Sequence, residues 1–152
     1  MKSMEPSSNL YTIGFTGKSA EQFFTLLKES NASRLIDIRI NRTSQLAGFA
    51  KEQDLKFLIP ELTSMEYVVR EELAPTKDLL ASYRKSEIPW DKFAQDYQSL
   101  LQDRALHNLL SREDFSDSVL LCSENKPEKC HRTLLANALI EQFPGLKIIH
   151  LL

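Results

Sequence analysis

Residues 120–132 read LLCSENKPEKCHR, and no other stretch of this 152-residue chain says as much about its fold. The stretch starts as an apolar strand and ends in a dense group of reactive side chains, namely Cys122, Glu124, Cys130, His131 and Arg132. It contains both cysteines of the chain and one of its three histidines. In α/β proteins, polar groups that follow a buried strand and precede a helix commonly form the functional site. We therefore expect a site at the end of this strand.

Outward from this stretch, five β-rich runs extend over residues 11–16, 34–39, 66–70, 119–122 and 147–152. The second, fourth and fifth runs are almost continuously apolar, which indicates burial on both faces and favours parallel strands. Helical patterns alternate with the runs. The fold class predicted is therefore α/β, a three-layer sandwich with a mainly parallel five-stranded sheet. A strand order of 3-2-1-4-5 is predicted, because it sets strands 1 and 4 side by side at a topological switch point.

Apolar residues at helical spacing mark the intervening helices. Ser19 and Gln22 have the spacing of a capping box at the start of the first helix, and Pro89 suits the first turn of another. Strands 3 and 4 are separated by residues 71–117, which predicts a helical insertion, with one helix continuing through Leu106, Leu109 and Leu110. We expect a disordered N-terminus over residues 1–8 and a single α/β domain over residues 9–152.

Composition narrows the class of protein. The formal net charge is −2, so the chain lacks the basic footprint of sequence-independent nucleic-acid binding. No apolar run reaches the roughly 18 residues of a membrane helix, and residues 1–8 do not resemble a signal peptide. A cytoplasmic location without membrane partners is predicted, and in that reducing compartment the two cysteines are expected to be free, reactive or metal-binding thiols.

Parallel strands place the residues at their carboxyl ends on one edge of the sheet. Because the helix that follows residue 130 offers unpaired N–H groups there, an anion is favoured at this edge. The predicted ligand-binding residues are Gly14, Thr16, Arg39 and Arg132. The candidate catalytic residues are Asp37, Cys122, Glu124, Cys130 and His131.

Two chemistries remain open for the cysteines. Cys130 is a candidate nucleophile, with Glu124 or His131 moving protons, although adjacent Cys and His side chains usually diverge. No arginine follows either cysteine at the phosphatase spacing of six residues. In the alternative, a divalent metal is the cofactor, and its ligands are Cys122, Cys130, His131 and His150. Seven residues separate the two cysteines, which is wider than the usual pairs of zinc ligands.

Six short motifs resemble one known family when they are taken together: Tyr11-Thr-Ile-Gly-Phe-Thr16, Leu35-Ile-Asp-Ile-Arg39, Thr43-Ser-Gln-Leu-Ala-Gly-Phe49, Leu73-Ala-Pro-Thr76, Leu121-Cys-Ser-Glu124 and Cys130-His-Arg132. The chain is similar over nearly its whole length to the bacterial and archaeal family catalogued as domain of unknown function 488. The resemblance implies an α/β fold without an established reaction, and signature positions at Gly14, Asp37, Arg39, Cys122, Glu124, Cys130, His131 and Arg132. Many relatives carry His-Ser where this chain has Phe15-Thr16, so a mechanism that depends on that histidine does not apply here.

The leading interpretation is an enzyme, or a degenerate enzyme, that binds a small anionic ligand such as a nucleotide or a phosphorylated metabolite. Arg39 and Arg132 would hold the anion, Glu124 or Asp37 would be the acid or base, and a cysteine would be nucleophile, metal ligand or sensor. The alternatives are a non-catalytic nucleic-acid-associated or regulatory binding module and a thiol or metal sensor.

Overall fold

The computed structural model describes residues 8–43, 45–104, 110–123 and 130–152. Five strands form one sheet in which every described pairing is parallel. They are β1 (Ser8–Gly14), β2 (Arg34–Asp37), β3 (Glu66–Val69), β4 (Ser118–Cys122) and β5 (Leu146–Leu151). The predicted α/β class and parallel five-stranded sheet are thus confirmed. Apart from Ser8, which opens β1, the segment predicted to be disordered lies outside the described residues.

The predicted strand order was wrong, because it exchanged the positions of β1 and β4. The sheet has the order β3-β2-β4-β1-β5, so β4 and not β1 lies beside β2. β4 takes the central position that the prediction gave to β1, and burial is the physical reason, because all five residues of β4 are buried whereas Asn9 of β1 is only half-buried. The prediction that strands 1 and 4 are adjacent is confirmed, with Gly14 opposite Cys122 in the register.

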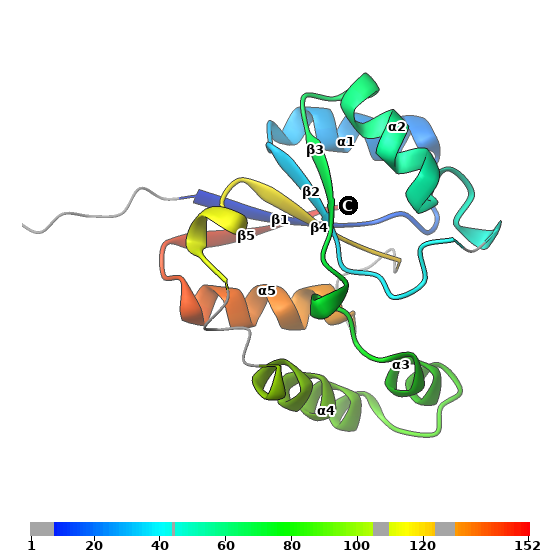
Figure 1. Ribbon diagram of the computed structural model, residues 1–152, viewed down its shortest axis with the longest axis vertical. Helices are drawn as coiled ribbons and strands as arrows, with labels where there is room; N and C mark the ends of the chain where they lie inside the picture. Colours follow the sequence, from blue (N-terminus) through cyan, green and yellow to red (C-terminus); the bar gives the residue numbers. More distant parts are fainter. Residues whose placement is uncertain (1–7, 44, 105–109, 124–129) are drawn as a thin grey trace, which may run out of the picture.

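The handedness of the crossover connections decides which face of the sheet each helix covers. The described α-helices are α1 (Ala20–Ser30), α2 (Glu52–Leu62), α3 (Lys77–Arg84), α4 (Trp90–Asp103) and α5 (His131–Gln142). The chain moves one way along the sheet from β1 to β3 and the opposite way from β3 to β5. Because parallel crossovers are right-handed, these two halves cover opposite faces. Figure 1 shows α1 and α2 on one face and α5 with α3 and α4 on the other.

Each face of the sheet has its own apolar core. Leu35 and Leu121 face α1 and α2, where they pack with Phe23 and Leu27. The spacing of Phe23 and Leu27 puts both on one side of α1, and the predicted capping box of Ser19 and Gln22 starts that helix. In the opposite core, Phe93 and Tyr97 of α4 and residues of α5 pack with Leu120 of β4 and with residues of β1, β2 and β5.

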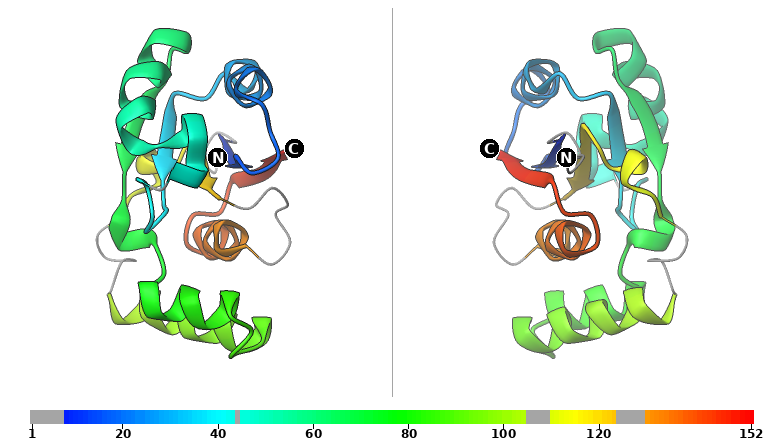
Figure 2. Two further views of the ribbon diagram at one scale, coloured as in Figure 1. Left: turned by 90° about the vertical axis from the view of Figure 1, so that its right-hand side faces the viewer. Right: turned by 90° about the vertical axis from the view of Figure 1, so that its left-hand side faces the viewer.

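The insertion between β3 and β4 folds over the end of α5. The 3₁₀ turns in the described part of the chain are η1 (Gln45–Ala50), η2 (Glu71–Leu73) and η4 (Arg112–Asp114). Arg104, the C-cap of α4, donates to the carbonyl oxygens of Glu72 and Ala74 and so ties α4 to η2. Figure 2 shows the α3–α4 pair beyond α5, away from the sheet. The predicted helical positions Leu106 and Leu109 lie outside the described residues.

The described helices include none that combines the length and the apolar character needed to cross a lipid bilayer.

Central position makes β4 the strand whose packing contributes most to stability. We expect Leu120→Ala to lower the free energy of unfolding by about 2–5 kcal/mol, because Leu120 is fully buried against α5 and its truncation leaves a cavity. Phe57→Ala on α2 is the control, since that side chain is 64% exposed and should cost less than about 0.5 kcal/mol. Urea denaturation of both variants checks the difference, and equal losses would contradict it.

Candidate functional site at the carboxyl edge of the sheet

Three strands and one helix bring the predicted site residues to the same edge. β1 ends at Gly14, β2 at Asp37 and β4 at Cys122, and α5 begins at His131. Two backbone hydrogen bonds join the segments that leave the strands, from Thr16 N to Ser123 O (3.1 Å) and from Ile38 N to Leu121 O (3.2 Å). The helices that follow β1 and β4, namely α1 and α5, lie on opposite faces of the sheet (Figure 1), which is the geometry in which α/β proteins bind ligands.

The two cysteine thiols touch each other at this edge. Cys122 is the last residue of β4, Cys130 is the N-cap of α5, and both are free and buried. The Cys130 thiol donates to Cys122 Sγ across 2.9 Å. This hydrogen bond, together with burial and the nearby charge of Cys122, raises the pKa of Cys130 despite the opposing effect of Arg132. Cys130 therefore stays protonated and Cys122 is the accepting sulfur.

His131 pairs with Cys122 and not with its sequence neighbour Cys130. Its Nδ1 lies 3.5 Å from Cys122 Sγ, and its Nε2 lies 3.1 Å from the carbonyl oxygen of Ile38. Because a carbonyl oxygen only accepts, Nε2 carries the hydrogen and Nδ1 is directed at the sulfur. The Tyr97 ring stands edge-on to the imidazole, with 5.7 Å between the ring centroids.

The environment of His131 favours its protonated form. Burial by itself would lower the pKa of the imidazole, but the charge and hydrogen bond of Cys122 and the carbonyl oxygen of Ile38 outweigh it and raise the pKa above 6.5. An imidazolium beside a sulfur acceptor is the arrangement of an activated Cys–His pair. The backbone of Ile38 supplies the third group that orients the base.

Asp37 and Arg39 form a buried ion pair just beyond β2. Asp37 is fully buried and Arg39 is 2% exposed. Arg39 Nε donates to Oδ1 (2.8 Å) and Nη2 to Oδ2 (2.7 Å), while the Tyr67 hydroxyl also donates to Oδ2 (2.5 Å). The backbone N–H of Arg39 donates to Oδ1 as well. Asp37 therefore holds Arg39 in place, and its role as an acid or base stays a prediction.

One arm of the Arg39 guanidinium remains available. Its Nη1 is buried and has no hydrogen-bond partner within the described part of the chain. The guanidinium carbon lies 5.3 Å from the centre of the Phe15 ring. Burial would lower the pKa of Arg39, but the hydrogen bond and charge of Asp37 raise it overall, so the group stays cationic. A buried donor of this kind is costly unless a ligand or water accepts from it.

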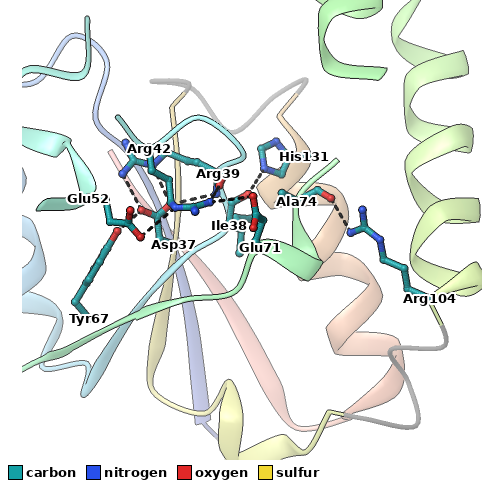
Figure 3. Close-up of polar contacts among 10 residues, drawn as sticks. All are labelled: Asp37, Ile38, Arg39, Arg42, Glu52, Tyr67, Glu71, Ala74, Arg104 and His131. Carbon is teal, nitrogen blue, oxygen red and sulfur yellow. Dashed lines mark hydrogen bonds and ion pairs between the residues drawn. The ribbon is translucent and has the colours of Figure 1, made fainter. Parts of the chain in front are cut away.

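Figure 3 shows Arg39 and His131 arranged around the same backbone segment, with Arg42 on the other side of Arg39 from His131. Arg42 Nη1 donates to the carbonyl oxygen of Arg39 across 2.9 Å, and Arg42 is paired in turn with Glu52 and Glu71. The turn that carries Arg39 is therefore braced from α2 and from η2.

Two further cations lie near the start of α5. Arg132 is fully buried, and its Nη1 lies 3.7 Å from Cys130 Sγ. Burial lowers the pKa of Lys18, and the positive charge of Arg132 lowers it further, so the two groups are close enough to repel. Beside Lys18 is a hollow of about 390 Å³, lined also by Gly17, Gln22, Thr25, Leu26 and Leu152. Like charges next to a helix N-terminus favour an anion.

Not every predicted residue joins this cluster. Gly14 ends β1 and is buried, whereas Thr16 is exposed. His150 lies on β5, where its Nδ1 is 2.6 Å from Thr12 Oγ1, and it is outside the group formed by the cysteines and His131. Glu124 lies outside the described residues.

Cys122, Cys130 and His131 are also a candidate metal site. Their donor atoms all lie within 4.8 Å of one another, and within the described ranges they are the one such group of three. Two thiolates on a tetrahedral zinc ion lie roughly 3.8 Å apart. The 2.9 Å separation of the two sulfurs is shorter, which suits a thiol pair better than two metal ligands.

Tyr67 and Lys18 were missed as site residues by sequence reasoning. The signal for Tyr67 was the alternation of side chains along the strands. Leu35 and Asp37 share a face of β2, and Tyr67 lies opposite Leu35 in the β2–β3 register. Finding it required the pairing of β2 with β3. Lys18 belongs to the segment that follows the first strand to this edge, but only the fold shows that it lies near Arg132.

Residues 19–139 match the family model described as "Domain of unknown function DUF488". The chain belongs to this family. The suspected family is thereby confirmed, and the range matched by the DUF488 model contains Asp37, Arg39, Cys122, His131 and Arg132. No curated protein matches the chain. No solved structure matches it either.

The Asp37–Arg39 pair should be essential to stability. Asp37→Asn leaves a buried guanidinium without its counter-charge, and we expect a loss of about 3–5 kcal/mol in the free energy of unfolding. Asp96→Asn removes the same charge from the exposed Lys92–Asp96 pair and should cost less than about 1 kcal/mol. Denaturant titration of the two variants measures both values, and a comparable small loss for Asp37→Asn would show that the buried pair is not a stabilising unit.

His131 should make stability depend on pH. Its pKa is raised in the folded state, so its contribution is fully present below the unfolded value of about 6.5 and is lost as the pH rises through the folded value. Unfolding measured in reducing buffer from about pH 5.5 to pH 8.5 should therefore show the difference between the wild type and His131→Asn shrinking with rising pH. Parallel pH curves for the two proteins would contradict this assignment.

Proposed function

We propose that this DUF488 protein is a cysteine-dependent enzyme acting on a small anionic substrate, with Cys122 as nucleophile, His131 as its base and Arg39 as the principal anion ligand. The observation that carries the proposal is the buried Nη1 of Arg39, which has no hydrogen-bond partner among the described residues and belongs to the same sheet edge as the Cys122–His131 pair. A free donor supports binding of a ligand, and an activated thiol supports covalent chemistry on it.

The nucleophile is supported by three contacts to Cys122 and its base. His131 Nδ1 takes the proton of Cys122, while the carbonyl oxygen of Ile38 holds the imidazole in the required orientation. The Cys130 thiol then donates to the resulting thiolate across 2.9 Å. The start of α5 adds the positive end of its helix dipole, which further stabilises a thiolate.

The substrate class follows from the cations. The chain as a whole is slightly acidic, so attraction of an anion depends on the local cluster of Arg39, Arg132 and Lys18. Arg39 is fixed by Asp37 and presents one arm, which suits an oxygen of a phosphate or carboxylate. The hollow beside Lys18 offers room for the uncharged part of a nucleotide or phosphorylated metabolite.

The reaction is a displacement in two halves. The Cys122 thiolate forms a bond to the electrophilic atom of the bound substrate, while the bond to the leaving group breaks and that group takes the proton held by His131. Water then cleaves the covalent adduct and gives a proton to His131, which releases the second product and returns the pair of thiolate and imidazolium. Arg39 stabilises the negative charge that develops on the anion during both halves.

Alkylation with two reagents of similar size tests the site without knowledge of the substrate. Iodoacetate carries a carboxylate and iodoacetamide is neutral, and each forms an S–C bond with loss of iodide. A simple thiolate reacts faster with the neutral reagent. We expect Cys122 to prefer iodoacetate, inorganic phosphate to slow that reaction, and His131→Asn to lower the rate with both reagents, by about 10² or more if His131 is the base.

Arg39→Lys is the decisive variant. Lysine keeps a positive charge for Asp37 but lacks the planar fork, so the preference for iodoacetate should fall, and urea denaturation of the variant shows whether it stays folded under the conditions of the assay. Arg34→Lys is the matched control, because Arg34 lies at the opposite end of β2, where it donates to the carbonyl oxygens of Glu113 and Asp114. If the wild type prefers iodoacetamide and Arg39→Lys behaves like Arg34→Lys, the proposed function is wrong.

A further inference from the structure

In the proposed displacement reaction the second thiol of the site donates a hydrogen bond to Cys122, but none of its own bonds is made or broken. Cys130 is nevertheless buried, held at the N-cap of α5 and kept protonated, with its sulfur 2.9 Å from the proposed nucleophile. The chain has two cysteines in all, and both are in this contact. The contact therefore suggests that Cys130 has a role in which it reacts with Cys122.

We infer that Cys122 and Cys130 form a reversible intramolecular disulfide when a hydroperoxide oxidises Cys122. The inference deepens the proposed function, on which it rests for the assignment of the thiolate to Cys122. The disulfide would switch off the nucleophile and protect it from irreversible oxidation.

The chemistry balances in two steps. The Cys122 thiolate attacks the distal oxygen of a hydroperoxide. An S–O bond forms, the O–O bond breaks, and the departing alkoxide takes a proton from His131 to leave as an alcohol, or as water for hydrogen peroxide. Cys130 Sγ then attacks the sulfenic acid, so that an S–S bond forms and the S–O bond breaks. The thiol proton of Cys130 leaves with the hydroxide as water. The peroxide is reduced by two electrons and the two thiols are oxidised by two.

The geometry demands little movement for the second step. A disulfide has its sulfurs about 2.05 Å apart, so Cys130 Sγ has to approach by less than about 1 Å. The backbone of Cys130 is extended and precedes the first helical residue, so its side chain can turn without breaking the helix. A protonated thiol beside Arg132 also suits the resolving role, because it supplies the proton and Arg132 stabilises the thiolate that attacks.

Mass spectrometry of the whole chain tests the inference. The reduced protein is separated from the reductant, kept in buffer with a chelator and treated with hydrogen peroxide. It is then denatured in the presence of iodoacetamide, which alkylates the remaining thiols, and its mass is measured. We expect the wild type to lose the mass of two hydrogens, to take up no alkyl group as a monomer, and to regain two alkylatable thiols after dithiothreitol. Cys130→Ser should instead stop at a sulfenic acid on Cys122, which dimedone traps, and then proceed to the sulfinic acid.

Cys122→Ser is the matched control for the order of events. Without the activated thiolate, Cys130 should remain reduced at the peroxide dose that fully oxidises the wild type. Three results would overturn the inference: the same sulfinic acid in the wild type as in Cys130→Ser, disulfides only between two chains, or oxidation of Cys130 in Cys122→Ser at the wild-type rate.

Failure here is distinguishable from failure of the proposed function. The mass change needs no anionic substrate, whereas the reagent preference of Cys122 is measured on the reduced protein. Disulfide formation without a preference for iodoacetate would leave the redox pair and remove the anion site. A preference for iodoacetate without a disulfide would do the reverse.

Discussion

A carboxylate and a guanidinium, both withdrawn from water, meet where the chain leaves β2. Neither charge is tolerable there alone, because an unpaired buried ion costs several kcal/mol. Asp37 accepts from the side chain and the backbone N–H of Arg39 and from Tyr67, so the turn after β2 has one favourable conformation. In that conformation the carbonyl oxygen of Ile38 lies 3.1 Å from His131 Nε2, and Arg39 Nη1 is buried without a hydrogen-bond partner among the described residues. Orientation of the base and presentation of the anion ligand thus depend on one ion pair.

Because β4 is the central strand and pairs with β2, the ion pair lies close to the cysteines. In the observed order β2 pairs directly with β4, and Asp37 lies opposite Leu121. Cys122 is therefore one residue further along β4 than the position opposite Asp37. With β1 between β2 and β4, as predicted, the guanidinium and the thiol would have been a strand further apart. Because β4 and not β1 lies beside β2, the Asp37–Arg39 salt bridge is close to the cysteines and belongs to the candidate site.

Charge is distributed so that the site is locally cationic in a slightly acidic protein. The imidazole of His131, the guanidinium groups of Arg39 and Arg132 and the start of α5 all stabilise negative charge in their surroundings. The same field that would hold an anionic substrate would also keep Cys122 as a thiolate. A thiolate in such surroundings is reactive toward oxidants as well as substrates. In the inferred reaction the neighbouring thiol of Cys130 protects Cys122 from irreversible oxidation, because it converts the oxidised sulfur into a disulfide that a reductant can reverse.

The sequence by itself determined the fold class, the five strands, the family and the edge of the sheet that carries the polar groups. Those features follow from local periodicity and from the common direction of parallel strands, as the apolar run before Cys122 and the capping box at Ser19 illustrate. Only the tertiary structure decided that His131 contacts Cys122, that Tyr67 reaches Asp37 and that β4 lies beside β2. These are contacts between segments far apart in the chain or between strand and helix. They are set by packing on both faces of the sheet and by the need to neutralise buried charge, neither of which leaves a periodic trace in the order of residues.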